Sequence, residues 1–378
     1  MERKKTIGIL GGGQLARMSA YQAYKLGFDV VILEKEKNSP AGQITKHEFV
    51  GWVDDEEIVK QFTLASDIVT LENEFVDYKR LEFIENLGKK VVPSSKVISL
   101  IQDKYIQKNT LAKKKIPIAK FIEINHDSSY DFISAQLGKK FILKSRKMGY
   151  DGYGNALVSD QRTLNIGLEK LSSRQSKLYA EAFVDFKMEL ATMVVRTKKE
   201  TKVYPIVHTI QENHICKIVI APAQISKQSI KIAEEISVAS VEAVGGYGIF
   251  GIEMFLTKDE NILVNEMAPR PHNSGHYSIE ACTTSQFENH IRAVLNLPLG
   301  STEMLQPYSV MINLLGKRNG EGMVQNYNRS LRNENIHLHV YGKEKSRIGR
   351  KMGHITLLGK NLNSILKQAT LIERQIII

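Results

Sequence analysis

Two short apolar runs, each carrying one glutamate, constrain the fold of this 378-residue chain more than any other feature. They are Gly251–Leu256 and Ile262–Met267, and the residues between them are mostly polar. Two apolar runs joined by a short polar connection are typical of a β-hairpin. A hairpin that is symmetric about the peptide between Asp259 and Glu260 places the two glutamates of the strands directly opposite each other.

These glutamates, Glu253 and Glu266, would be cross-strand neighbours with Cβ atoms about 5 Å apart. Two like charges at this distance among apolar residues are unfavourable unless a cation lies between them. Mg²⁺ typically binds one or two carboxylates together with substrate phosphates, and Asn265 offers another oxygen beside Glu266. The sequence therefore predicts a Mg²⁺ site on Glu253 and Glu266. The alternative is a one-residue register slip that moves one glutamate into solvent.

The segment before residue 95 alternates strand-like and helix-like patterns, which predicts a parallel α/β sheet. A helix is expected at Gln14–Leu26, and a second helical pattern covers residues 94–115. The expected strands are Thr6–Leu10, Val30–Leu33, Ile68–Leu71 and Lys90–Pro93.

A glycine turn follows the first strand, with the sequence Gly11-Gly12-Gly13-Gln14. Glycines before a helix let backbone N–H groups approach an anion, and Glu34 ends the second strand where a ribose-binding acid would stand. Three interpretations stay open at this point: NAD binding, a phosphate site for another ligand, and a tight structural turn.

Lysines and a second glycine-rich loop lie in the middle of the chain. Lys144 ends an apolar strand and precedes the loop Gly149–Gly154, whose backbone can close over phosphates. Lys104 stands near the start of a helix. A strand then leads from Leu178 into Glu181–Val184, with Glu189 beyond, which is a plausible adenosine slot.

Composition limits the class of protein. The longest apolar runs are far shorter than the roughly 20 residues that a bilayer requires. The charged N-terminus leads into a strand rather than a signal peptide, and only two cysteines are present, Cys216 and Cys282. We therefore expect a cytoplasmic protein without a membrane segment. The net charge of +11 is spread over scattered lysines, which favours anionic small substrates over nucleic acid.

Together these motifs resemble the ATP-grasp superfamily, and more narrowly the family of N5-carboxyaminoimidazole ribonucleotide synthetases. The resemblance covers nearly the whole chain. It rests on Gly11–Met18, Thr70–Val76, Gly149–Gly152, Asn265–Arg270, His272–His276, Ser285–Glu288, Ser309–Leu314 and Gly349–His354. It departs at Tyr153, where a basic residue is usual, and at Glu72–Asp77.

The resemblance implies an ATP-grasp fold of mixed α/β and α+β class with four parts. They are a Rossmann-like pre-ATP-grasp domain (1–95), a small lid subdomain (96–183), a large subdomain (184–320) and a small C-terminal β unit (321–378).

It also implies roles for single residues. ATP would contact Lys104, Lys144, Gly149, Tyr150, Asp151, Gly152, Tyr153, Gly154, Asn155, Glu181, Ala182, Phe183, Val184, Glu189, Gln211, Asn265 and Glu266. Mg²⁺, or Mn²⁺ in its place, would bind Glu253 and Glu266, with two ions expected. The ribonucleotide would contact Gln14, Glu72 or Glu74, Tyr150, Asn273, Ser274, Lys343, Arg350 and Lys351. Residues at the reaction centre would be Asp151, Asn273, His276 and Lys351.

The implied enzyme is a ligase of purine synthesis that forms a C–N bond and acts as a homodimer. Bicarbonate would attack the γ-phosphate of ATP to give carboxyphosphate, and the amine of 5-aminoimidazole ribonucleotide would capture the carboxyl group. Three alternatives are a formate-dependent glycinamide ribonucleotide transformylase, an NAD-dependent oxidoreductase and a non-catalytic nucleic-acid binder. The oxidoreductase leaves the hairpin glutamates and Lys144 unexplained, and only the basic charge suggests the nucleic-acid binder.

Overall fold

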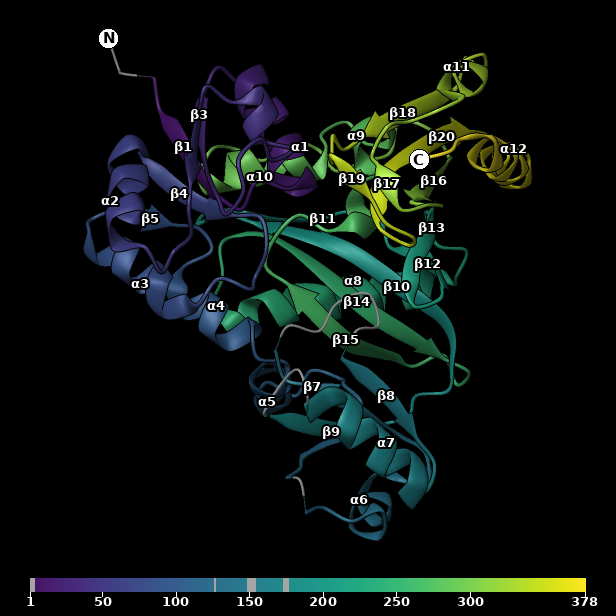
Figure 1. The fold of residues 1–378 in the computed structure, drawn as a ribbon. Helices are drawn as coiled ribbons and strands as arrows, with labels where there is room; N and C mark the ends of the chain where they lie inside the picture. The colour runs from purple at the N-terminus through teal and green to yellow at the C-terminus, as the bar shows by residue number, and fades with distance from the viewer. Residues whose placement is uncertain (1–3, 126, 148–153, 173–176) are drawn as a thin grey trace.

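The computed structural model describes residues 4–125, 127–147, 154–172 and 177–378 (Figure 1). They form a parallel sheet near the N-terminus, a small antiparallel sheet, a large central sheet and a short two-stranded pair. Within these described ranges, no helix is long and apolar enough to cross a membrane.

The first sheet has five parallel strands in the order β3-β2-β1-β4-β5. The strands are β1 (Thr6–Leu10), β2 (Asp29–Glu34), β3 (His47–Val50), β4 (Ile68–Leu71) and β5 (Lys90–Val91). Its helices are α1 (Gln14–Lys25), α2 (Glu56–Ala65) and α3 (Tyr78–Asn86), with the 3-10 turn η1 (Gly42–Ile44). All residues of β4 are buried, as in parallel strands that helices cover on both faces. The predicted parallel α/β sheet is confirmed.

Two helices, rather than one, occupy the segment that the sequence predicts to be helical. They are α4 (Ser95–Ile101) and α5 (Lys104–Lys113). The break falls at Asp103, whose carboxylate accepts hydrogen bonds from the backbone N–H groups of Tyr105 (3.0 Å) and Ile106 (3.2 Å). This N-cap fixes the start of α5 and so places Lys104 in the first turn of the helix.

The small antiparallel sheet, here called the lid sheet, has the order β6-β9-β7-β8. It contains β6 (Phe121–Glu123), β7 (Phe141–Ser145), β8 (Asn155–Val158) and β9 (Leu178–Ala182). Helices α6 (Tyr130–Leu137) and α7 (Gln161–Ser172) pack against it and enclose a small core of its own. Figure 1 shows this unit projecting below the central sheet.

The central sheet has nine strands in the order β15-β14-β10-β12-β13-β16-β20-β18, with β11 paired to β10. Their bounds are β10 (Phe186–Arg196), β11 (Thr201–Val203), β12 (Val207–Glu212), β13 (Ile215–Ala221), β14 (Gly248–Thr257), β15 (Ile262–Ala268), β16 (Tyr308–Leu315), β18 (Ile336–Val340) and β20 (Lys351–Gly359). Helix α8 (Lys227–Val244) packs on β10, β14 and β15, while α10 (Gln286–Val294) packs between this sheet and α1.

The C-terminal strands extend the central sheet. The sequence predicts a small closing β unit, and its two strands, β18 and β20, do pair with each other. They also join the large sheet, because β16 pairs with β13 on one edge and with β20 on the other. The remaining elements are η2 (Asn273–Gly275), α9 (Ser278–Ala281), β17 (Gly320–Glu321), α11 (Tyr327–Ser330), β19 (Lys345–Ser346) and α12 (Leu362–Gln375).

Candidate active site

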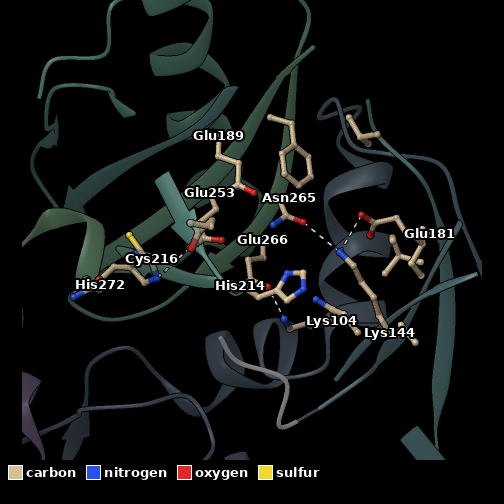
Figure 2. Close-up of a pocket in the computed structure, with 18 of the residues that line it drawn as sticks. Lys104, Lys144, Glu181, Glu189, His214, Cys216, Glu253, Asn265, Glu266 and His272 are labelled. Carbon is tan, nitrogen blue, oxygen red and sulfur yellow. Dashed lines mark hydrogen bonds and ion pairs between the residues drawn. The ribbon is translucent and has the colours of Figure 1, made fainter. Parts of the chain in front are cut away.

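A cleft of about 840 Å³ lies where the lid sheet, the central sheet and the edge of the first sheet meet. Figure 2 shows Lys104 of α5 pointing toward Glu266 on β15, and Lys144 of β7 lying between Glu181 on β9 and Asn265 on β15. Most of the predicted site residues line the cleft. They are Gln14, Glu72, Glu74, Lys104, Lys144, Asn155, Glu181, Ala182, Phe183, Val184, Glu189, Gln211, Glu253, Asn265, Glu266, Asn273 and Lys351.

The β14–β15 hairpin places Glu253 directly opposite Glu266, so the predicted pairing of these two residues is confirmed. The predicted symmetry about the turn is wrong, because nearer the turn the register shifts by one and Met254 pairs with Val264. The shift leaves Asn265 as the extra residue of a β-bulge. In a regular strand Asn265 and Glu266 would point to opposite faces, whereas beside the bulge both line the cleft.

The two hairpin carboxylates have opposite protonation tendencies. Burial raises the pKa of Glu253, and the facing Glu266 raises it further, to about 8. Burial alone would also raise the pKa of Glu266, but the Lys104 ammonium, 2.5 Å from its carboxylate, outweighs burial and lowers it. The imidazole of His272 lies 3.4 Å from Glu253. Burial, with Arg270 and Lys351 nearby, lowers the pKa of His272 to about 3, so this ring is neutral and offers Glu253 no positive charge.

This carboxylate pair fits a hard divalent cation. Glu253 and Glu266 supply facing oxygens, Asn265 supplies an amide oxygen, and the site opens into a cleft large enough for a nucleotide. Without a cation, one of the pair keeps a proton near neutral pH, as the raised pKa of Glu253 shows. Two facing carboxylates that cannot both ionise without an added positive charge are expected at a site that binds a cation.

A buried triad of charges forms the floor of the cleft beneath the lid sheet. Glu181 on β9 forms ion pairs with Lys144 on β7 (3.1 Å) and with Lys108 on α5 (3.0 Å). Glu181 is expected to border adenine, but its carboxylate is committed to these two lysines. Lys108 is a site residue that the sequence analysis missed. Its spacing of four from Lys104 on a helix was the available signal, since such residues share one face.

The outer end of the cleft carries the residues expected around adenosine. Ala182, Phe183 and Val184 line it where β9 ends, and Glu189 lies on β10 with Gln211 on β12. Burial raises the pKa of Glu189. His214, in the tight β12–β13 turn, also lines this end and was missed because a hairpin turn gives no binding signal in the sequence.

Part of the predicted flap lies outside the described residues: Gly149, Tyr150, Asp151, Gly152 and Tyr153. Its described end consists of Gly154, with φ of 97°, and Asn155, which begins β8. The Gly154 carbonyl accepts a hydrogen bond from the Ser145 N–H (2.8 Å) and so ties this end of the flap to β7.

The glycine turn after β1 directs its N–H groups at the chain's own carboxylates. Gly12 donates to Glu34 (2.7 Å), while Gly13 and Leu15 donate to Glu72 (2.5 and 3.1 Å). Burial raises the pKa of Glu72 despite these bonds. A Cβ at Gly13 would come within 2.3 Å of the Glu72 carboxylate, so any larger residue would displace this carboxylate from the turn. The NAD interpretation needs a free Glu34, and that carboxylate is bonded within the turn.

The end of the cleft near α1 carries a second charged pair. Arg270 donates two hydrogen bonds to Glu74, at 2.5 and 3.0 Å. Asn273 exchanges hydrogen bonds with Asn313 on β16, at 3.0 and 2.6 Å, which fixes the amide beside Lys351 and His272. Arg270 and Asn313 were not identified as site residues, although both lie inside sequence motifs that carry the resemblance.

Four predicted residues are not brought to the cleft surface. His276 is fully buried, and its Nδ1 is bonded to Gln286 (2.9 Å), whose side chain also holds both backbone groups of His272. Its expected direct role at the reaction centre is therefore corrected to a supporting one. The same correction applies to Ser274, which is buried and bonded to His272 Nδ1. Lys343 and Arg350 donate to backbone carbonyls and do not line the cleft, and their contact with the ribonucleotide phosphate stays a prediction.

Comparison with known families agrees with this geometry. The model of the ribonucleotide synthetase preATP-grasp domain matches residues 4–102, and that of the ATP-grasp domain matches 109–287. The fold and the site thus define an ATP-grasp protein. The model of the phosphoribosylaminoimidazole carboxylase C-terminal domain matches residues 309–368. The chain belongs to the family of N5-carboxyaminoimidazole ribonucleotide synthases, since curated members match 93% and 96% of it at 37% and 34% identity.

Named relatives support this assignment. The N5-carboxyaminoimidazole ribonucleotide synthase of Bacillus subtilis is 34% identical over 96% of this chain and 94% of its own length. The phosphoribosylaminoimidazole carboxylase of Ogataea methanolica is 40% identical over 98% of this chain. The chain spans about two thirds of the length of such eukaryotic carboxylases, 69% for Ogataea methanolica and 64% for Candida albicans.

Solved structures give the same result. The N5-carboxyaminoimidazole ribonucleotide synthetase of Thermotoga maritima superposes with a TM-score of 0.87 at 40% identity, over 99% of both chains. The carboxyaminoimidazole ribonucleotide synthase of Aspergillus clavatus, complexed with ATP, superposes with a TM-score of 0.90 at 39% identity, over 98% of this chain and 99% of that one.

Proposed function

We propose that this chain carboxylates the amine of 5-aminoimidazole ribonucleotide, with ATP and bicarbonate as co-substrates, to give N5-carboxyaminoimidazole ribonucleotide in purine synthesis. The observation that carries the proposal is the facing pair Glu253 and Glu266, set in a cleft opposite Lys104 and Lys144. A relative from Aspergillus clavatus was solved in complex with ADP and 5-aminoimidazole ribonucleotide, which supports both substrates. The carboxylase C-terminal domain model favours bicarbonate over formate as the activated acid.

Glu253 and Glu266 would hold two Mg²⁺ ions, with the Asn265 oxygen beside them. When bound, Mg²⁺ neutralises charge on the phosphates and on the group in transfer. The chain's own part is positioning. Lys144 is held by Glu181 and Asn265 at 3.1 and 3.3 Å, so its ammonium is fixed at the point where β7 reaches the cleft. Lys104 stands in the first turn of α5 and can turn from Glu266 to the phosphates.

The chemistry divides into two displacements. A bicarbonate oxygen attacks the γ-phosphorus of ATP, the bond to the β-phosphate oxygen breaks, and ADP and carboxyphosphate form. The exocyclic nitrogen of the ribonucleotide then attacks the carboxyl carbon, phosphate leaves, and the amine loses a proton. Because carboxyphosphate is short-lived in water, the cleft must exclude solvent between the steps.

The residues proposed near this transfer are Asn273 and Lys351, together with Asp151 of the flap. Asn273 is oriented by Asn313, and both Asn273 and Lys351 line the cleft at the end nearest Gln14, Glu72 and Glu74. That end is the proposed ribonucleotide site. We propose that Lys343 and Arg350 act from outside the cleft surface on the ribonucleotide phosphate. Burial lowers the pKa of Arg350, but a guanidinium stays charged at neutral pH.

A homodimer and a cytoplasmic location are proposed from the resemblance, and sedimentation equilibrium giving the mass of two chains would support the first. The catalytic proposal is tested by ADP release with two substrate pairs. We expect release with bicarbonate plus 5-aminoimidazole ribonucleotide and only background release with formate plus glycinamide ribonucleotide. Release with the second pair alone would contradict the proposal.

A further inference from the structure

A cluster of two histidines and one glutamate lies behind the reaction centre, outside the cleft. His339 on β18 stands directly opposite His354 on β20, with ring centroids 4.4 Å apart. Glu280 of α9 reaches this pair, and its Oε1 lies 2.6 Å from His339 Nε2. One nitrogen from each ring and one carboxylate oxygen all lie within 4.8 Å of one another. Two strands and a helix therefore direct three donor side chains at a single point.

Two atoms of this cluster lack the partners that buried polar atoms normally have. His354 Nε2 and Glu280 Oε2 are buried, and neither has a hydrogen-bond partner among the residues that the structure describes. His354 is 0% exposed. Leaving such atoms unpaired costs free energy, so a buried imidazole nitrogen beside a spare carboxylate oxygen indicates a missing ligand.

A further contact orients one of the rings. The Tyr341 hydroxyl lies 2.9 Å from His354 Nδ1, which leaves Nε2 directed at the cluster. Metal-binding histidines show this arrangement, because a hydrogen bond on the second ring nitrogen sets the tautomer and the ring orientation. The donor set of two imidazole nitrogens and one carboxylate suits zinc-class cations and leaves one position open for water. Mg²⁺ prefers oxygen ligands and is disfavoured here.

From these observations we propose that Glu280, His339 and His354 form a site for a divalent transition metal of the zinc class, separate from the Mg²⁺ site on the hairpin. Ligand atoms about 2.1 Å from a tetrahedral ion are about 3.4 Å apart, so Glu280 Oε1 and His339 Nε2 must separate from their 2.6 Å hydrogen bond to admit the ion. His339 is partly exposed and can turn out of its stack on His354 to do so.

The place of the cluster gives the metal a structural consequence. Helix α9 follows directly on the segment that carries Asn273, and β20 begins at Lys351. A metal bound by the three residues would link α9 to β18 and β20. It would thereby fix the positions of Asn273 and Lys351 relative to each other. The proposal needs no assumption about the reaction, so failure of the carboxylase assignment would leave it intact.

The test is Co²⁺ binding to the full chain, followed by visible absorption in excess Mg²⁺, which saturates oxygen-only sites. We expect one equivalent of Co²⁺ with the absorption of a nitrogen-ligated ion, and loss of that absorption when Zn²⁺ is added. His339→Gln and Glu280→Gln should each weaken binding at least about tenfold, because each removes one of three ligands. His337→Gln is the matched control, since His337 lies on the same strand two residues from His339, is exposed and is not one of the three donors.

A thermal measurement tests the same site without using the visible absorption of Co²⁺. Zn²⁺ should raise the melting temperature of the unmodified chain and of His337→Gln, because a ligand that binds only the folded state stabilises it. The same addition should leave His339→Gln unchanged. Equal Co²⁺ binding and equal Zn²⁺ shifts in the unmodified chain and in both ligand variants would overturn the proposal.

Discussion

Two pairs of carboxylates lie in or beside the cleft, and their negative charge is stabilised in different ways. Glu34 and Glu72 lie beside the glycine turn, where backbone N–H groups of Gly12, Gly13 and Leu15 bind them. Glu253 and Glu266 face each other across a hairpin, and Lys104 forms an ion pair with Glu266. The first pair is satisfied by the chain itself, whereas the second needs a further positive charge.

The difference shows which acids serve the fold and which serve the ligand. A carboxylate at the start of a helix occupies the N–H groups that an anionic ligand could otherwise bind. The N–H groups of the glycine turn are therefore taken up by carboxylates of the same chain. A carboxylate opposed by another carboxylate is costly unless a cation joins them. Substitutions at the hairpin should therefore affect activity more than stability, and substitutions at the glycine turn the reverse.

The largest expected effect is that of Glu266→Ala. It removes one half of the proposed Mg²⁺ site and should lower ATP-dependent ADP formation by about a thousandfold or more, because charge stabilisation of the transferred phosphoryl group is lost. Circular dichroism should show an intact fold. Glu260→Ala, an exposed glutamate of the same hairpin, is the control and should keep its activity. Near-normal turnover of Glu266→Ala would contradict the proposal that Glu266 binds Mg²⁺.

Lys108→Met should have the next largest effect. It leaves Glu181 with a single lysine, and breaking a buried ion pair costs about 3–5 kcal/mol of the free energy of unfolding. Lys144 should then be held more tightly by Glu181, so the KM for ATP should rise by about tenfold with a smaller change in kcat. Urea unfolding and steady-state kinetics measure the two effects. An unchanged KM would mean that Lys108 has no positioning role.

The Mg²⁺ affinity should depend on pH, because the cation needs an ionised Glu253. The pKa of Glu253 is raised to about 8, so affinity should fall by about tenfold for each pH unit below that value. In the Mg²⁺-free chain the folded state holds this proton between pH 4.5 and about 8, whereas the unfolded chain releases it. This group's contribution to stability should therefore fall as pH rises through that window. Calorimetry that finds a flat pH profile would contradict the coupling.

Glu72→Gln tests the other side of the comparison. The amide keeps one acceptor oxygen but loses the charge that the N–H groups of Gly13 and Leu15 bind, which should cost about 1–3 kcal/mol of the free energy of unfolding. ATP affinity should change little, since this turn lies at the far end of the cleft. A loss of activity as deep as that of Glu266→Ala, with full stability, would erase the distinction between the two pairs.

Arg350→Ala should have the smallest effect. Its guanidinium is bonded to the Lys345 carbonyl and does not line the cleft, so we expect the KM for the ribonucleotide to rise only a few-fold, with kcat retained. Initial rates over a range of ribonucleotide concentration measure this. A large fall in kcat at unchanged KM would place Arg350 at the chemical step instead.

Much of this architecture is predictable from sequence because local patterns determine it. The first sheet follows from buried apolar runs with helical segments between them, and the facing of Glu253 and Glu266 follows from two short strands around a tight turn. The bulge at Asn265 could not be predicted, since nothing local marks the one-residue shift.

Long-range contacts account for the other differences. In the local sequence Lys108 is one polar residue of a helix, and its ion pair with Glu181 of β9 is visible only in the folded structure. His276 carries a motif that suggests catalysis, yet Gln286 and the surrounding aromatic rings bury it. The joining of β18 and β20 to the central sheet depends on β16, which lies between them and β13 in space.

The most direct test of the central claim is the binding of ADP by calorimetry, with and without Mg²⁺, to the unmodified chain and to Glu266→Gln. If the hairpin acids hold the cation, Mg²⁺ should strengthen ADP binding at least about tenfold in the unmodified chain and leave it unchanged in the variant. Equal strengthening by Mg²⁺ in both proteins would contradict the account.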